Sequence, residues 1–157
     1  MIAEFERYHG VALRSIIVSA RRPVTIESWD EVGRIDSYRL NIRTAVHIKH
    51  SAKRLAPWQF TFTDDELGEL SDLRLGAASL WLVFVCGLDG LVALSDIEFA
   101  KVAGPASGST PFIRIDRDRR LMYRVFGNAG KLPGAKANGV EQIIRDAFAD
   151  AAGGGIA

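Results

Sequence analysis

The sequence contains a single cysteine, Cys86, among its 157 residues. One cysteine cannot form an internal disulfide, and alone it cannot build a cysteine-based zinc site. Long apolar runs are also missing, since the longest one, Leu80 to Cys86, is far shorter than the about 20 residues that span a bilayer. Residues 1–14 are mixed and charged, without the apolar segment of a secretory signal. These absences predict a cytoplasmic protein that does not insert into a membrane.

An excess of charge of one sign is missing as well. The 20 Lys and Arg residues nearly balance the 19 Asp and Glu residues, which leaves a formal net charge of +1. This balance excludes a polycationic tail and argues against disorder. With 48% hydrophobic residues, the chain is long enough for one buried core. We expect a single domain over residues 1–152 and a flexible, glycine-rich tail over residues 153–157.

Hydrophobic periodicity predicts an α/β fold with a mixed central β-sheet flanked by helices. Thr63 followed by Glu66 is typical of a capping box at the start of a helix. The uninterrupted apolar run 80–86 is typical of a central strand that is buried on both faces. The expected helices cover residues 2–20, 63–75 and 140–152, and the expected strands cover residues 24–29, 34–40, 45–50, 58–62, 80–86, 91–94, 112–115 and 121–126.

The predicted hairpin between residues 34 and 50 carries ionisable side chains. A two-residue turn at Ile42-Arg43 would pair Asp36 with Lys49 and Tyr38 with His47. Because side chains alternate between the faces of a strand, these four residues would share one face. A polar face in the middle of a sheet is costly unless it meets solvent or forms a site. An ordinary cross-strand ion pair between Asp36 and Lys49 is the alternative explanation.

The order of elements and the spacing Asp36…His47-Ile48-Lys49 resemble the PD-(D/E)xK nuclease superfamily. The resemblance implies a restriction-endonuclease-like core (αβββαβ) and a divalent-metal-dependent DNA phosphodiesterase of the endonuclease type. Asp36 would bind Mg²⁺ or Mn²⁺, and Lys49 would position the attacking water or neutralise phosphate charge.

His47 departs from that family pattern, because the family usually has Glu at this position. Imidazole is a poor ligand for Mg²⁺, so His47 is either a ligand for a softer ion or a polar replacement. Glu6 on the first helix is a candidate for the missing carboxylate. The departure keeps a second hypothesis open, in which a catalytically degraded nuclease-fold protein binds nucleic acid or a protein partner in a regulatory or defence role.

Basic residues are concentrated in two segments, residues 49–54 and residues 114–136, whereas acidic residues are concentrated in residues 64–72. Such segments can contact phosphates, and an exposed tryptophan can stack on a base. A solvated hairpin and a mobile loop over residues 127–139 are the alternative, and a small-molecule pocket under that loop has no residue that specifies a ligand. The oligomeric state, a homodimer included, stays open. The residues expected to bind DNA or other nucleic acid are Ser51, Lys53, Arg54, Trp58, Arg119, Arg120 and Lys131.

Overall fold

In the computed structural model, which describes residues 1–29, 36–104 and 109–149, the first helix, α1 (Glu4–Ala20), buries one stripe of side chains and exposes the opposite face. Its buried residues, His9, Ala12, Ile16 and Ala20, recur at intervals of three and four as an amphipathic helix requires. The helix ends at Arg21, which adopts a left-handed backbone conformation with φ of 54°. Within the described ranges, no helix is long and apolar enough to cross a membrane.

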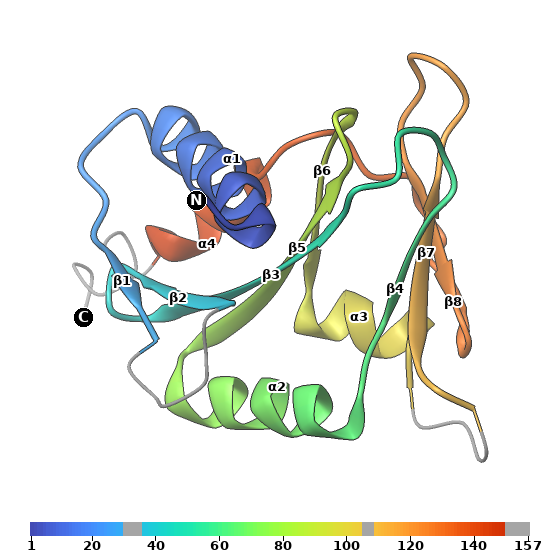
Figure 1. Cartoon of the computed structure of the whole chain (residues 1–157). Helices are drawn as coiled ribbons and strands as arrows, with labels where there is room; N and C mark the ends of the chain where they lie inside the picture. The colour runs from blue at the N-terminus through green and yellow to red at the C-terminus, as the bar shows by residue number, and fades with distance from the viewer. Residues whose placement is uncertain (30–35, 105–108, 150–157) are drawn as a thin grey trace.

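A five-stranded mixed sheet forms the centre of the fold, with strand order β1-β2-β3-β5-β6 (Figure 1). The first three strands pair antiparallel. A crossover through helix α2 (Asp64–Gly76) then brings β5 parallel to β3, and β6 pairs antiparallel with β5. The strands are β1 (Ile26–Ser28), β2 (Ser37–Leu40), β3 (Thr44–Ser51), β5 (Ser79–Cys86) and β6 (Gly90–Ser95).

A second, four-stranded antiparallel sheet packs beside the first, with order β4-β7-β8-β9. It begins with β4, which leaves the end of β3 through a loop and leads into α2. Residues 127–139, expected as a loop, contain the two-residue strand β9, and Lys136 forms an isolated bridge with Tyr123, so part of this segment is β-structure. The strands are β4 (Trp58–Thr61), β7 (Phe112–Asp116), β8 (Arg124–Gly127) and β9 (Gly130–Lys131).

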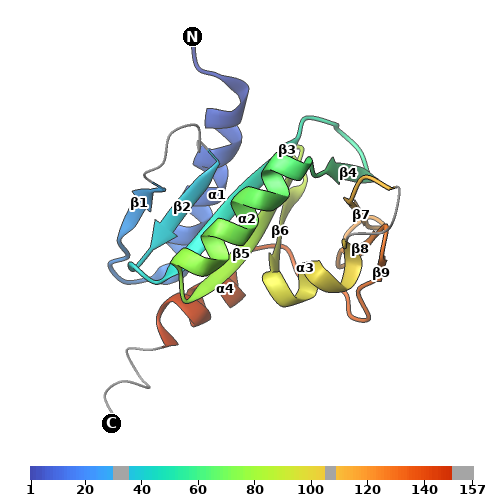
Figure 2. The ribbon, with the colours of Figure 1, turned by 90° about the horizontal axis from the view of Figure 1, so that it is seen from below.

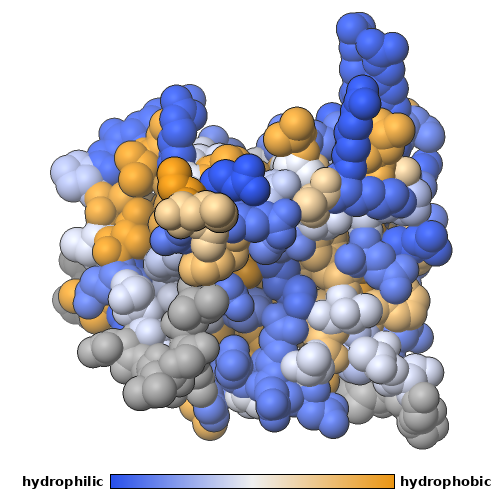
Figure 3. Space-filling model, viewed as in Figure 1, coloured by the Kyte–Doolittle hydropathy of each residue, from blue (hydrophilic) through white to orange (hydrophobic). Residues whose placement is uncertain are grey.

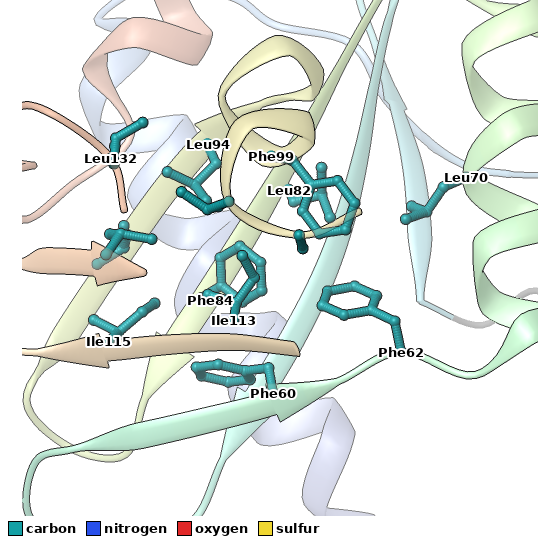
Figure 4. Close-up of a cluster of buried hydrophobic side chains, with 14 of the residues drawn as sticks. Phe60, Phe62, Leu70, Leu82, Phe84, Leu94, Phe99, Ile113, Ile115 and Leu132 are labelled. Atoms are coloured by element: carbon teal, nitrogen blue, oxygen red, sulfur yellow. The ribbon is translucent and has the colours of Figure 1, made fainter. Parts of the chain in front are cut away.

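Hydrophobic cores lie on both faces of the five-stranded sheet. Helices α1 and α4 (Glu141–Ala147) cover one face, and α2 crosses the other (Figure 2). Helix α3 (Asp96–Val102) and the second sheet complete the core on the α2 side, where aromatic rings interlock (Figure 4). Strand β5 is buried from Leu80 to Cys86 because it contributes side chains to both cores. The prediction of an α/β fold with a mixed, helix-flanked sheet is confirmed.

The register of the β2–β3 hairpin differs from the expectation by one residue. Its turn contains three residues, and two of them, Asn41 and Ile42, have positive φ angles of 49° and 71°. As a result Ser37, and not Tyr38, lies opposite His47. A shift of one residue moves every side chain of a strand to the other face of the sheet. This shift decides which candidate residues meet.

Candidate nucleic-acid interface

The predicted constellation is divided between the two faces of the sheet. Tyr38 pairs with Val46, and both belong to the side that α1 covers. His47 and Lys49 point to the opposite side, where both contact Glu66 of α2. The expectation that Asp36, Tyr38, His47 and Lys49 share one face is therefore wrong. The cause is the three-residue turn, whose sequence Asn41-Ile42-Arg43 contains no glycine or other residue pattern that indicates its length.

On the α2 side, His47, Lys49 and Glu66 form a closed polar cluster, called here the Glu66 cluster. The Nε2 atom of fully buried His47 donates to Glu66 over 2.9 Å, and its Nδ1 atom lies 2.9 Å from the Ser37 hydroxyl. Lys49 donates to both carboxylate oxygens of Glu66, at 2.8 and 2.9 Å, and to the Thr61 carbonyl at 2.7 Å. Every partner in the cluster is thus supplied by the protein itself.

The ionisation of Glu66 follows from these contacts. Burial alone would raise the pKa of its carboxyl, but hydrogen bonds from His47 and Lys49 and their charges outweigh burial and hold the pKa below its ordinary value. Glu66 is therefore a carboxylate near neutral pH, and it balances the Lys49 ammonium. The Lys49 ammonium is thus paired with a carboxylate of the protein itself.

On the α1 side, buried His9 links Asp36 and Tyr38. Its Nδ1 atom lies 2.8 Å from the Tyr38 hydroxyl, and its Nε2 atom lies 3.4 Å from Asp36. The interaction with His9 is the main reason that the pKa of Asp36 is lowered, and partial burial opposes it. Burial and the nearby carboxylates raise the pKa of Tyr38, which stays a neutral phenol. Asp36 itself is 41% exposed.

The acidic residues of α1 have other partners. Glu6 accepts a hydrogen bond from the backbone N–H of Ala3 over 2.8 Å, so it caps the helix that carries it. Glu4 lies 3.4 Å from His50, whose ring stacks on Tyr8 at 4.5 Å between centroids. In the described part of the chain, no group of three or more His, Cys, Asp or Glu residues is placed to hold a metal ion. With Asp36 and His47 on opposite faces, the residues present do not fit a shared magnesium or manganese site.

The two basic segments, by contrast, do meet. The loop between β3 and β4, the β5–β6 turn and the β7–β8 hairpin lie along one edge of the molecule (Figure 1). Together they enclose a cleft of about 490 Å³, the arginine cleft. The hairpin tip, which projects at the upper right, is hydrophilic in Figure 3. The lining residues are Arg54, Leu55, Ala56, Trp58, Asp89, Arg117, Arg119 and Arg120.

Internal hydrogen bonds hold the β3–β4 side of the cleft in place. Trp58 is only 1% exposed, and its indole N–H donates to the Lys53 carbonyl over 2.8 Å. Lys53 in turn donates to the Pro57 carbonyl, and the Ser51 hydroxyl accepts from the Lys53 backbone. The expectation that Trp58 is exposed for stacking is therefore wrong, because the indole ring anchors the loop from inside. Arg54 projects from this braced loop.

Asp89 ties the hairpin side of the cleft to the core. Its carboxylate lies 2.8 Å from the Arg117 guanidinium and accepts a hydrogen bond from Tyr123 over 2.6 Å. The charge of Arg117 is thereby balanced within the protein. Arg54, Arg119 and Arg120 make no ion pair among the described residues, so the cleft carries about three unbalanced positive charges.

Two further lysines of the basic segments lie outside the cleft. Lys131 is exposed on the edge strand β9. Lys136 is buried, pairs with Glu98 at 3.0 Å and hydrogen-bonds Gln142, so it supports the fold instead of presenting charge. Of the basic residues in 114–136, Arg119 and Arg120 at the hairpin tip therefore line the cleft with Arg117, whereas Lys131 lies apart from it.

Sequence reasoning missed the residues that organise the cleft. Asp89 lies in a short turn, Leu88-Asp89-Gly90, that has the composition of any surface turn. Arg117 was one arginine among several, with no pattern to mark it as the paired one. No protein-family model matches this sequence, and the chain has no significant similarity to a curated protein or to a solved structure.

Proposed function

We propose that this protein binds nucleic acid through the arginine cleft, on a restriction-endonuclease-like core that has no working cleavage site. The carrying observation is that Arg54 and the pair Arg119-Arg120 come from segments more than 60 residues apart in sequence and line the same cleft. Guanidinium groups bind phosphate oxygens in a bidentate manner. Here the loop and the hairpin that carry them are held in place by internal contacts. A phosphate backbone is the polyanion that fits this arrangement.

The order of elements supports the core assignment. Helix α1, the antiparallel strands β1, β2 and β3, the crossover helix α2 and the parallel strand β5 follow one another as the family resemblance implies, with β4 inserted before α2. The non-catalytic part of the proposal is supported by the position of Asp36 and His47 on opposite faces of the sheet, and by the pairing of Lys49 with Glu66. We therefore favour binding over metal-dependent hydrolysis.

The test is fluorescence anisotropy with a labelled oligonucleotide of about 20 nucleotides, single-stranded and duplex, at several salt concentrations. The variant combines Arg119→Gln with Arg120→Asn, because Asn tolerates the positive φ of 67° at residue 120. The matched control, Arg14→Gln with Lys101→Gln, removes the same charge from exposed positions on α1 and α3. We expect the cleft variant to bind at least tenfold more weakly and the control to bind within twofold of the parent.

Equal weakening in both double variants would reduce the interaction to net charge and overturn the proposed site. Plasmid incubated with Mg²⁺ or Mn²⁺ tests the absence of cleavage. The non-catalytic part would be overturned, in favour of a phosphodiesterase, if the parent cleaves the plasmid and Asp36→Ala abolishes this cleavage. The change Asp65→Ala, at an exposed position, is the control and should leave such cleavage intact.

A further inference from the structure

The four-stranded sheet buries one face and exposes the other. Trp58 and Phe60 of β4, Ile113 and Ile115 of β7, and Val125 of β8 point into the core. The residues between them face outward, as the alternation of side chains along a strand requires. Helix α3 contacts β8 and β9, and its residues Phe99 and Val102 join the core on the inner face with Ile113 and Val125. The composition of the outer face therefore indicates what this face can contact.

One row of side chains crosses all four strands on the outer face. Gln59 lies opposite Arg114, Arg114 opposite Phe126, and Phe126 opposite Lys131. Directly paired residues point to the same side, with Cβ atoms about 5 Å apart. The Phe126 ring is half-buried and lies between two exposed cations, with the Arg114 guanidinium 6.0 Å from the ring centroid.

A second aromatic side chain lies on the same face. Phe112 precedes Arg114 by two residues on β7, so it is diagonal to Phe126 at about 7–8 Å. Its ring is also half-buried, and its strand partner is the exposed Thr61. The face therefore presents two separate aromatic platforms with Arg114 between them.

Aromatic rings flanked by cations on an open sheet fit unpaired bases. A duplex hides the faces of its bases, whereas a single strand offers each base for stacking while its phosphates meet nearby cations. We infer that this outer face binds single-stranded nucleic acid, with Phe126 and Phe112 stacking on bases and Arg114 and Lys131 contacting phosphates. The inference rests on the proposed function, because it names the kind of nucleic acid that the chain takes.

The sheet face is continuous with the arginine cleft. Strands β7 and β8 lead from Arg114 and Phe126 into the hairpin that carries Arg119 and Arg120 (Figure 1). Two carboxylates lie on this path, Asp116 and Asp118, and Arg124 pairs with both at 3.2 Å. A single strand of nucleic acid stacked on this face would thus reach the cleft by passing two carboxylates whose charge Arg124 already offsets.

The test compares a labelled single strand and a duplex of the same sequence by fluorescence anisotropy. We expect the parent to bind the single strand more tightly than the duplex. Phe126→Ala should weaken single-strand binding about tenfold and leave duplex binding within twofold. Phe126→Tyr keeps a stacking ring and should restore the affinity. Ile97→Ala, at an exposed apolar position on α3, is the matched control and should change neither affinity.

A second variant guards against a folding defect in Phe126→Ala. Arg114→Gln with Lys131→Gln changes only exposed side chains, and it should also weaken single-strand binding. Unchanged single-strand affinity in both variants, together with weaker binding by the Arg119→Gln, Arg120→Asn protein, would overturn this inference and leave the proposed function standing. A parent protein that binds neither form would overturn both.

Discussion

The Glu66 cluster and the arginine cleft lie at opposite ends of β4. Lys49 of the cluster donates to the carbonyl of Thr61 at one end, and Trp58 lines the cleft at the other. Both regions are rich in charge, but they differ in where the charge is balanced. In the cluster, the Lys49 ammonium lies 2.8 Å from a Glu66 carboxylate oxygen, and the His47 ring hydrogen-bonds the same carboxylate at 2.9 Å. In the cleft, Asp89 balances only Arg117, and the other guanidinium groups face solvent.

This difference teaches how a charged motif is to be weighed. A Lys or His that is hydrogen-bonded on all sides is committed to the fold, whatever motif it matches in sequence. Cations held apart from carboxylates on a braced surface are available to a ligand. Changes in the cluster should therefore act mainly on stability, and changes in the cleft mainly on binding.

The largest effect is expected for Glu66→Ala. The change leaves the Lys49 ammonium with the Thr61 carbonyl and the Phe62 ring but no carboxylate, and it leaves the buried His47 N–H without an acceptor. Removing one partner of a largely buried ion pair costs about 3 kcal/mol of unfolding free energy. Urea denaturation measures this loss, and Glu69→Ala, one turn further along α2, is the control. A loss no larger than that of Glu69→Ala would contradict a structural role for the cluster.

Gly87→Ala should have the next largest effect, and it should reach the cleft. Residue 87 has a φ of +55°, and an added Cβ would lie 2.3 Å from the Lys53 carbonyl, which accepts from Trp58. We expect a loss of about 2 kcal/mol in unfolding free energy and weaker nucleic-acid binding, since the loop bearing Arg54 must move. Gly68→Ala, on open helix surface, should instead stabilise the protein. Equal thermal melting of the two variants would contradict this bracing.

Acidification gives a smaller, graded effect on the cluster. The pKa of Glu66 is lower in the folded protein than its ordinary value of 4.5, so its contribution to stability is complete above about pH 4.5. This contribution is lost as the pH falls through the lowered pKa, because the unfolded chain binds the proton more tightly than the folded protein does. Glu66→Gln should therefore lose less unfolding free energy than the parent between pH 6 and pH 3, by denaturation at each pH. Parallel curves for the two proteins would exclude this linkage.

Much of the fold could be predicted from local patterns. The apolar run 80–86 indicated a strand buried on both faces, and the spacing of apolar residues indicated α1. The capping box predicted at Thr63 is confirmed only in part. The Thr63 hydroxyl accepts from the Glu66 backbone over 3.1 Å, but the Glu66 side chain turns to His47 and Lys49. A side chain placed by tertiary contacts cannot be read from a local motif.

The candidate site could be predicted less well, because it depends on register and on long-range pairing. One extra residue in the turn at Asn41–Arg43 moved Asp36 and His47 to opposite faces. The burial of Trp58 follows from its hydrogen bond to Lys53 and its packing against Tyr123, which is 65 residues away in sequence. The sequence shows two basic segments, but only the fold brings Arg54 of one and Arg119 of the other into the same cleft.

The smallest effect on stability is expected in the cleft itself. Arg119→Gln with Arg120→Asn removes two cations that have no carboxylate partner among the described residues, so the unfolding free energy should stay within about 0.5 kcal/mol of the parent. The same variant should lower the slope of log affinity against log salt by about two, one for each lost phosphate contact. Denaturation and salt-titrated anisotropy on one preparation measure both quantities. A clear loss of stability with an unchanged salt slope would place these arginines with the Glu66 cluster as structural residues, and the contrast between the two regions would disappear.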